Sequence, residues 1–183
     1  KKLRYPDPGV DFDGEPIWSP DSAHVAFLRI PTTSRVFAFG PVREAPPFSI
    51  RVVDARTEKG HELWQADSGQ GSAFHDVMAK KQLLWTSGDR IVFPWEKNGW
   101  EQLYSISLKG GKPELLTPGD AEVEHVALGG DRNTIYYSTN LNDIDRRHIW
   151  KVSANSKSAS PVTSGSAIEW QPAALSNGSI AFL

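Results

Sequence analysis

Histidine and carboxylate residues are the groups through which this chain could bind a metal ion or transfer a proton. The stretch HELWQ at 61–65 begins like the H-E-x-x-H motif, in which two histidines on one face of a helix bind zinc. Gln65 stands where the second histidine is required, and the stretch is predicted to be a strand. This motif therefore predicts no zinc site.

The five histidines have no spacing that is typical of metal ligands. Four of them lie in or beside predicted strands as ordinary sheet residues, whereas His75 lies in a long connection and is the one to test. Asp143 and Asp145 could together hold a cation, but Arg146 and Arg147 follow them and are expected to pair with their carboxylates. We therefore expect no metal ion and no cofactor.

Signatures of other reactive sites are also incomplete. The sequence contains no G-x-S-x-G motif, which would place a nucleophilic serine on a sharp turn. The stretch GQGSAF at 69–74 lacks the third glycine of a dinucleotide-binding loop, and DFDG at 11–14 lacks the rest of a calcium loop. The chain itself is therefore predicted to be non-catalytic, with no catalytic residue.

The elements that must position the polar residues recur along the chain. Phe27, Phe93, Tyr137 and Phe182 hold the same place in the second strand of four similar units. The last three of these residues are about 45 residues apart, a repeat length typical of β-propeller blades. The first step is longer because an insertion at 31–49 separates the second and third strands of the first unit.

The stretch at 88–120 shows what one unit contains. Asn98-Gly99 and Gly110-Gly111 tolerate positive φ and predict two tight turns between three apolar runs. Leu83–Trp85 adds a fourth run in front, so four short antiparallel strands follow one another. Four such strands form one propeller blade, which buries its apolar faces against neighbouring blades.

The chain is therefore predicted to be all-β, a single partial β-propeller of about three and a half four-stranded antiparallel blades. A short helical turn is expected near His75 to Lys81. Because the chain lacks an initial methionine and ends inside a predicted strand, we expect it to be a piece of a longer protein. The predicted units are a lead-in at 1–13, a blade at 14–66 with the insertion at 31–49, a connection at 67–82, blades at 83–120 and 121–165, and the first half of a further blade at 166–183.

Composition excludes several classes of function. The net charge is −2 and no basic stripe is present, so binding to the phosphates of a nucleic acid is not expected. No apolar run approaches the length of a membrane span. Cysteine is absent, which excludes disulfides and thiolate metal sites but leaves the compartment open.

The connections of an up-and-down sheet alternate between its two ends. Turns at one end of the predicted blades are short, whereas the connections between strands two and three and between blades are long. Loops on a rigid scaffold often carry function, although long loops can also simply cover apolar blade edges. We call the end with the long connections the loop face. Its charged and aromatic residues are Arg35, Arg43, Glu44, His75, Glu96, Lys97, Trp100, Asp143, Asp145, Arg146 and Arg147.

The blade motifs resemble a known family. IWSPDS at 17–22, followed by HVAFLR at 24–29, is similar to the repeat of TolB-like propellers. Together with the stretches at 93–120, 123–140 and 143–152, it resembles the N-terminal propeller of bacterial family S9 serine peptidases, the prolyl oligopeptidase and dipeptidyl peptidase IV group. The third unit departs from the pattern, because Gly-Gly-Asp replaces Ser-Pro-Asp at its first turn.

The resemblance implies a propeller that limits the access of short peptides to a C-terminal α/β-hydrolase domain of the parent chain, and it favours a periplasmic location. In dipeptidyl peptidases, glutamates of the propeller also hold the free amino terminus of the substrate. No adjacent Glu-Glu pair exists here, which leaves Glu44 and Glu96 as candidates. The residues expected to bind substrate are Arg43, Glu44, Glu96, Trp100, Arg146 and Arg147.

Two other functions stay open at this point. A TolB-like protein-interaction scaffold with no enzymatic domain would carry the same repeats. A sugar-processing propeller would need several inward carboxylates and an arginine cluster, and the first strands of the units offer few. Exposed blade edges could also pair with a second copy of the chain.

Overall fold

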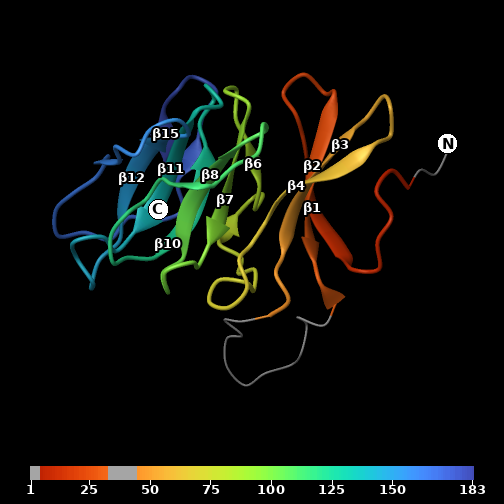
Figure 1. Cartoon of the computed structure of the whole chain (residues 1–183). Coiled ribbons are helices and arrows are strands. Elements are labelled where there is room, and N and C mark those ends of the chain that lie inside the picture. Colours follow the sequence, from red (N-terminus) through yellow and green to blue (C-terminus); the bar gives the residue numbers. More distant parts are fainter. Residues whose placement is uncertain (1–4, 33–44) are drawn as a thin grey trace.

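The computed structural model describes residues 5–32 and 45–183 (Figure 1). Within these ranges the regular elements are β-strands, with no α-helix and hence no helix that is long and apolar enough to cross a membrane. The strands form sheets that stand next to one another in chain order (Figure 1). The prediction of an all-β, partial propeller is confirmed.

Two of the sheets are four-stranded and antiparallel throughout, in the order of the chain. The first contains β1 (Phe12–Trp18), β2 (His24–Ile30), β3 (Ser49–Asp54) and β4 (Gly60–Gln65). The second contains β6 (Leu84–Trp85), β7 (Arg90–Trp95), β8 (Gln102–Ser107) and β9 (Glu114–Leu115). Both sheets have the strand number and order expected of propeller blades.

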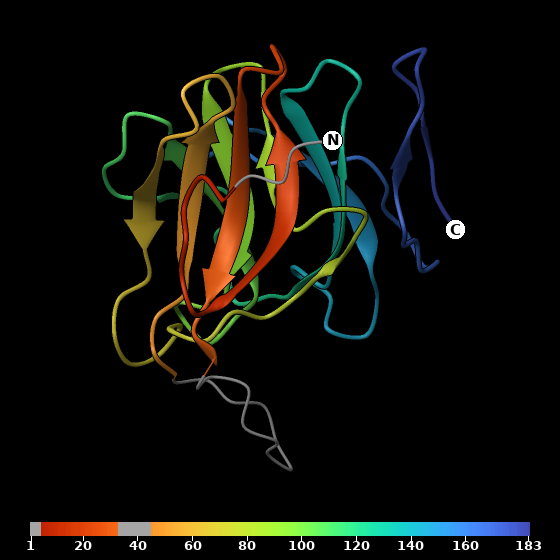
Figure 2. The same cartoon turned by 90° about the vertical axis from the view of Figure 1, so that its right-hand side faces the viewer.

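The third sheet has the same four antiparallel strands and one more. It contains β10 (Val123–Leu128), β11 (Thr134–Thr139), β12 (His148–Ser153) and β13 (Ser160–Pro161), and β5 (Met78–Ala79) pairs with β10 in parallel. A short hairpin of β14 (Ala173–Ala174) and β15 (Ile180–Ala181) stands beside this sheet (Figure 2). The strands lie within or at the edges of the predicted units. That these units form a single domain stays a prediction.

The prediction of a helical turn near residues 75–81 is wrong, because this segment is extended and contains β5. The side-chain amide of Gln82 accepts from the Val77 backbone N–H at 3.0 Å and donates to the Val77 carbonyl at 2.9 Å. These bonds, and the ladder with β10, satisfy backbone groups that a helical turn would have had to satisfy locally.

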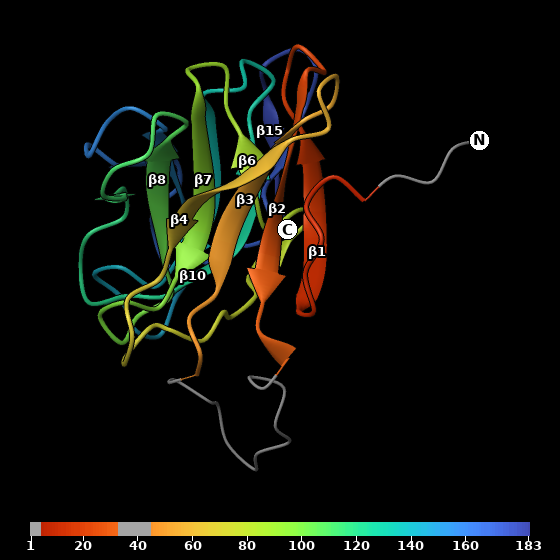
Figure 3. The ribbon, with the colours of Figure 1, turned by 45° about the vertical axis from the view of Figure 1, so that its right-hand side comes forward.

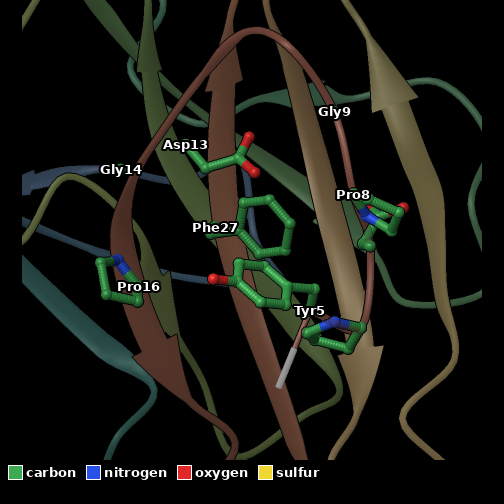
Figure 4. A pocket seen from close by; sticks show the side chains of 9 residues that line it. Tyr5, Pro8, Gly9, Asp13, Gly14, Pro16 and Phe27 are labelled. Carbon is green, nitrogen blue, oxygen red and sulfur yellow. The ribbon is translucent and has the colours of Figure 1, made fainter. Parts of the chain in front are cut away.

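The aligned aromatic residues of the repeat occupy equivalent positions. Phe93 is fully buried among residues of the first sheet, and Tyr137 is buried against residues of the second. Each therefore faces the preceding blade. Phe27 is on the corresponding face of the first blade, where the N-terminal segment covers it in place of a blade (Figure 4).

The first turn of each unit also repeats. Ser22, Asp89 and Arg132 have φ values of 59°, 53° and 55°, so a left-handed residue stands at the same place in three turns. The Gly-Gly-Asp turn of the third unit keeps the backbone bond of the first, because the Arg132 N–H donates to the Gly129 carbonyl at 2.9 Å, as the Ser22 N–H does to the Ser19 carbonyl. Asp131 also accepts from the Thr134 N–H, in place of the serine hydroxyl that accepts the equivalent bond in the first turn. The departure in sequence therefore does not change the turn.

Apolar residues from facing sheets form two cores. One lies between the first and second sheets and is rich in aromatic rings, with the Trp64 and Trp95 rings 4.7 Å apart edge to face. The other lies between the second and third sheets, around Val92, Leu103 and Ile135. The rigid packing of three blades fixes the strand ends that carry the long connections.

Candidate functional site

Acidic residues gather in a hollow of about 420 Å³ on the loop face. Its walls come from the segment before β5, the end of β7, the residue before β8 and the start of β10. The long connection that leads to β5 lies at the lower end of the sheets in Figures 1 and 3. We call this hollow the acidic pocket. It is lined by His75, Asp76, Val77, Met78, Glu96, Glu101, Glu122, Val123, Glu124 and His125.

The hairpin between β7 and β8 supplies two of the carboxylates. Trp95 pairs with Gln102 in the β-ladder, so Glu96 and Glu101 lie opposite one another at the next position. Like charges at directly opposed positions destabilise a hairpin. Both residues are only 9% exposed, which makes the arrangement costlier still and marks it as a candidate site.

His75 brings an imidazole to the same place from the connection before β5. Its Nδ1 atom lies 2.6 Å from a Glu96 carboxylate oxygen and 3.9 Å from a Glu101 oxygen. One ligand atom from each of the three residues lies within 4.8 Å of the other two. This is the one group of at least three potential metal ligands so arranged in the described part of the chain.

Glu101 is the least satisfied member of the cluster. Its backbone N–H donates to a Glu122 carboxylate oxygen at 2.8 Å, but its own Oε1 atom is buried and has no hydrogen-bond partner among the described residues. Burial, and then the negative charges of Glu96, Glu122 and Asp76, raises the pKa of the Glu101 carboxyl to about 9. Glu101 is therefore protonated at neutral pH when the pocket holds no cation.

The edge of the pocket carries an ion pair. The Arg147 guanidinium donates to Glu124 Oε1, with Nε at 2.9 Å and Nη2 at 2.8 Å, which joins the β11–β12 connection to the start of β10. Both side chains are about one third exposed, so the pair contributes little to stability. It neutralises one of the acidic groups that line the pocket and leaves the inner carboxylates unaffected.

The predicted site residues have different fates. Glu96 and His75 lie in the pocket, and Arg147 reaches its edge by pairing with Glu124 rather than with a neighbouring aspartate. Arg146 pairs with Asp143 at 3.1 Å, as expected, and does not line the pocket. Trp100 is half-buried and also does not line it, while Arg43 and Glu44 lie outside the described residues.

Sequence reasoning missed Glu101, Glu122 and Glu124. The first could have been found from the hairpin, because two glutamates placed symmetrically about Asn98-Gly99 must face one another across a tight turn. The other two begin the next blade, and no local pattern shows that this point lies beside the hairpin. Their position follows from the bond between the Val123 N–H and the Glu101 carbonyl at 2.8 Å.

A second hollow of about 370 Å³ lies on the outer face of the first blade, between Tyr5, Pro16 and Phe27 (Figure 4). Asp13 faces it, but both of its carboxylate oxygens accept from Arg29, at 2.7 and 2.8 Å. Arg29 also donates to the backbone carbonyl of Asp7 at 2.7 Å. These contacts fasten the N-terminal segment to the blade, and we assign them a structural role.

Comparison with known proteins decides the family. The model of the dipeptidyl peptidase IV N-terminal region matches residues 41–183. The chain belongs to this family. A probable dipeptidyl peptidase 4 of Emericella nidulans is 32% identical to this member over 165 residues, which cover 85% of the chain and 20% of the relative. The resemblance to the propeller of family S9 peptidases is confirmed.

Solved structures with the same fold include a dipeptidyl peptidase 4 and TolB proteins. Dipeptidyl peptidase 4 of Porphyromonas gingivalis superposes with a TM-score of 0.68 at 14% identity, over 100% of this chain and 24% of that one. TolB of Acinetobacter baumannii superposes with a TM-score of 0.56 at 16% identity, over 94% of this chain and 37% of that one. At such identities the likeness shows the fold alone. The chain spans only about a fifth of the length of the Emericella relative.

Proposed function

We propose that this chain is the non-catalytic propeller portion of a family S9 serine peptidase, and that it limits the access of peptides to a separate α/β-hydrolase domain. Its membership of the dipeptidyl peptidase IV N-terminal family supports the class of parent protein. The observation that carries the proposal is the difference between the two ends of the blades. Short turns close one end, whereas long connections and the acidic pocket occupy the loop face.

The size of the substrate tests the gating role. The parent protein is expected to cleave a short peptide at least 100-fold faster than the same sequence inside a stably folded protein. An unfolded, chemically blocked form of that protein serves as the control for sequence context. Equal rates of cleavage of the peptide and of the folded protein would contradict the gating role. A parent gene that encodes no hydrolase domain would contradict the whole proposal.

We also propose that peptides contact the loop face through Glu96, Trp100, Arg146 and Arg147, together with Arg43 and Glu44. Trp100→Ala and Arg146→Ala in the parent peptidase are expected to raise KM roughly tenfold and to leave kcat unchanged, as loss of uniform binding predicts. Asp89→Asn is the matched control, because Asp89 is exposed in a short turn at the other end of the second blade. Unchanged KM in both variants would contradict these contacts.

A TolB-like interaction scaffold without an enzymatic domain is the second candidate. The superposition on TolB of Acinetobacter baumannii supports the fold that such a scaffold needs. A stoichiometric protein partner that binds this chain, and is lost when loop-face residues are changed, would favour the scaffold. Peptidase activity of the parent protein would favour the first proposal.

A further inference from the structure

We propose that His75, Glu96 and Glu101 form a binding site for one divalent transition-metal ion, of the zinc or manganese class, in the acidic pocket. The inference goes beyond the gating role and does not depend on it. It departs from the expectation, drawn from the spacing of the histidines, that the chain binds no metal. The three residues become neighbours only because the connection before β5 passes the end of the β7–β8 hairpin.

The geometry of the donor atoms fits a single ion. An imidazole nitrogen and two carboxylate oxygens lie within 4.8 Å of one another, and the His75 nitrogen is 2.6 Å and 3.9 Å from the two oxygens. Ligands at about 2.1 Å from a zinc ion lie roughly 3 to 3.5 Å from one another. Small changes in the side-chain torsion angles would bring the three donor atoms to such distances.

Glu101 supplies an independent observation. The whole residue is 9% exposed and lines the pocket, and its Oε1 atom has no hydrogen-bond partner among the described residues. A buried carboxylate oxygen without a partner costs free energy. A bound cation would take the place of the Glu101 proton, give this oxygen a partner, and offset the repulsion that two ionised glutamates facing one another across the hairpin would have.

The surroundings suit a metal centre. Glu122 holds the backbone N–H of Glu101 through a 2.8 Å bond, so it can fix the position of a ligand without being one. Asp76 also lines the same hollow and adds a further carboxyl group. The volume of about 420 Å³ leaves room for water molecules to complete the coordination.

The imidazole of His75 indicates which kind of cation the pocket would bind. Carboxylates alone are sufficient to hold the ammonium group of a peptide, so an imidazole nitrogen would add nothing to such a site. Calcium and magnesium prefer oxygen ligands, whereas zinc and manganese accept a mixture of imidazole and carboxylate. The combination of one nitrogen and two carboxylates therefore favours a transition metal.

Calorimetric titration of the EDTA-stripped and dialysed protein tests the inference. ZnCl₂ and MnCl₂ are added separately, with CaCl₂ as the comparison ion. One equivalent of zinc or manganese is expected to bind, and His75→Gln or Glu101→Gln is expected to weaken binding at least tenfold. CoCl₂ gives a second readout, because a bound cobalt ion develops visible absorption bands that both variants should lose.

Asp89→Asn serves as the control variant, because its carboxylate lies in a turn at the other end of the blade. Circular dichroism and the melting temperature show whether each variant is folded; His75 is partly exposed, so its substitution is the safer one for the fold. Absence of saturable binding, or binding unaltered in both variants, would overturn the inference. A peptide with a free amino terminus that binds here, unlike its acetylated form, while the metal ions do not, would overturn it too.

Discussion

Replacing Glu101 by glutamine should change how the stability of the metal-free protein depends on pH. The folded-state pKa of this carboxyl is about 9, above its ordinary value of 4.5. The folded chain therefore binds a proton that the unfolded chain releases, and the associated stability is complete below pH 4.5 and is lost as the pH rises toward 9. The glutamine side chain would keep a neutral group of the same shape at this position, so the variant should not show this loss.

The magnitude follows from the linkage between proton binding and folding. Between these two pKa values, one such group lowers the free energy of unfolding by about 1.4 kcal/mol for each pH unit. From pH 5.5 to pH 7.5 the wild-type protein should therefore lose on the order of 3 kcal/mol relative to Glu101→Gln. The buried position of the side chain, 12% exposed, leaves little screening by solvent.

Urea unfolding followed by tryptophan fluorescence, in buffers that contain EDTA, measures this difference. Wild type, Glu101→Gln and Asp89→Asn are compared at both pH values, because contributions from other titrating groups cancel between variants. Asp89→Asn should follow the wild type. If Glu101→Gln also follows the wild type, Glu101 titrates as an ordinary carboxyl, and the inference that burial keeps it protonated is refuted.

Two further predictions concern contacts that stabilise the fold. A methyl group at Gly71, where φ is +80°, would lie 2.9 Å from the Lys97 Cα atom, so Gly71→Ala should cost about 3 kcal/mol in urea unfolding. Gly69→Ala, at φ +94° with no atom within 4 Å, should cost only about 1 kcal/mol; equal costs would contradict the contact. Arg29→Met should cost about 1 kcal/mol and speed amide exchange near Asp13, because Asp13 loses its partner while its side chain, 39% exposed, can be hydrated. Unchanged exchange there would show that Arg29 does not fasten the N-terminal segment.

Much of the fold was accessible from the sequence because the blades are local structures. Each strand of a blade pairs with the next along the chain, so alternating apolar residues and turn residues are sufficient to place it. The equivalent positions of Phe93 and Tyr137 in their cores, inferred from the alignment of the repeated strands, show how far this reasoning extends. The β5 strand was missed because its partner, β10, lies about 45 residues further along the chain.

The amino-acid sequence by itself determined the class of fold, the repeat and the end of the blades on which the long connections gather. These features depend on periodicity and on turn residues, which act over a few neighbouring positions. Only the tertiary structure decided that His75 meets Glu96 and Glu101, and that an oxygen of Glu101 is buried without a partner among the described residues. Packing of whole blades brings these distant residues together, and burial, which sets the pKa of Glu101, exists only after that packing.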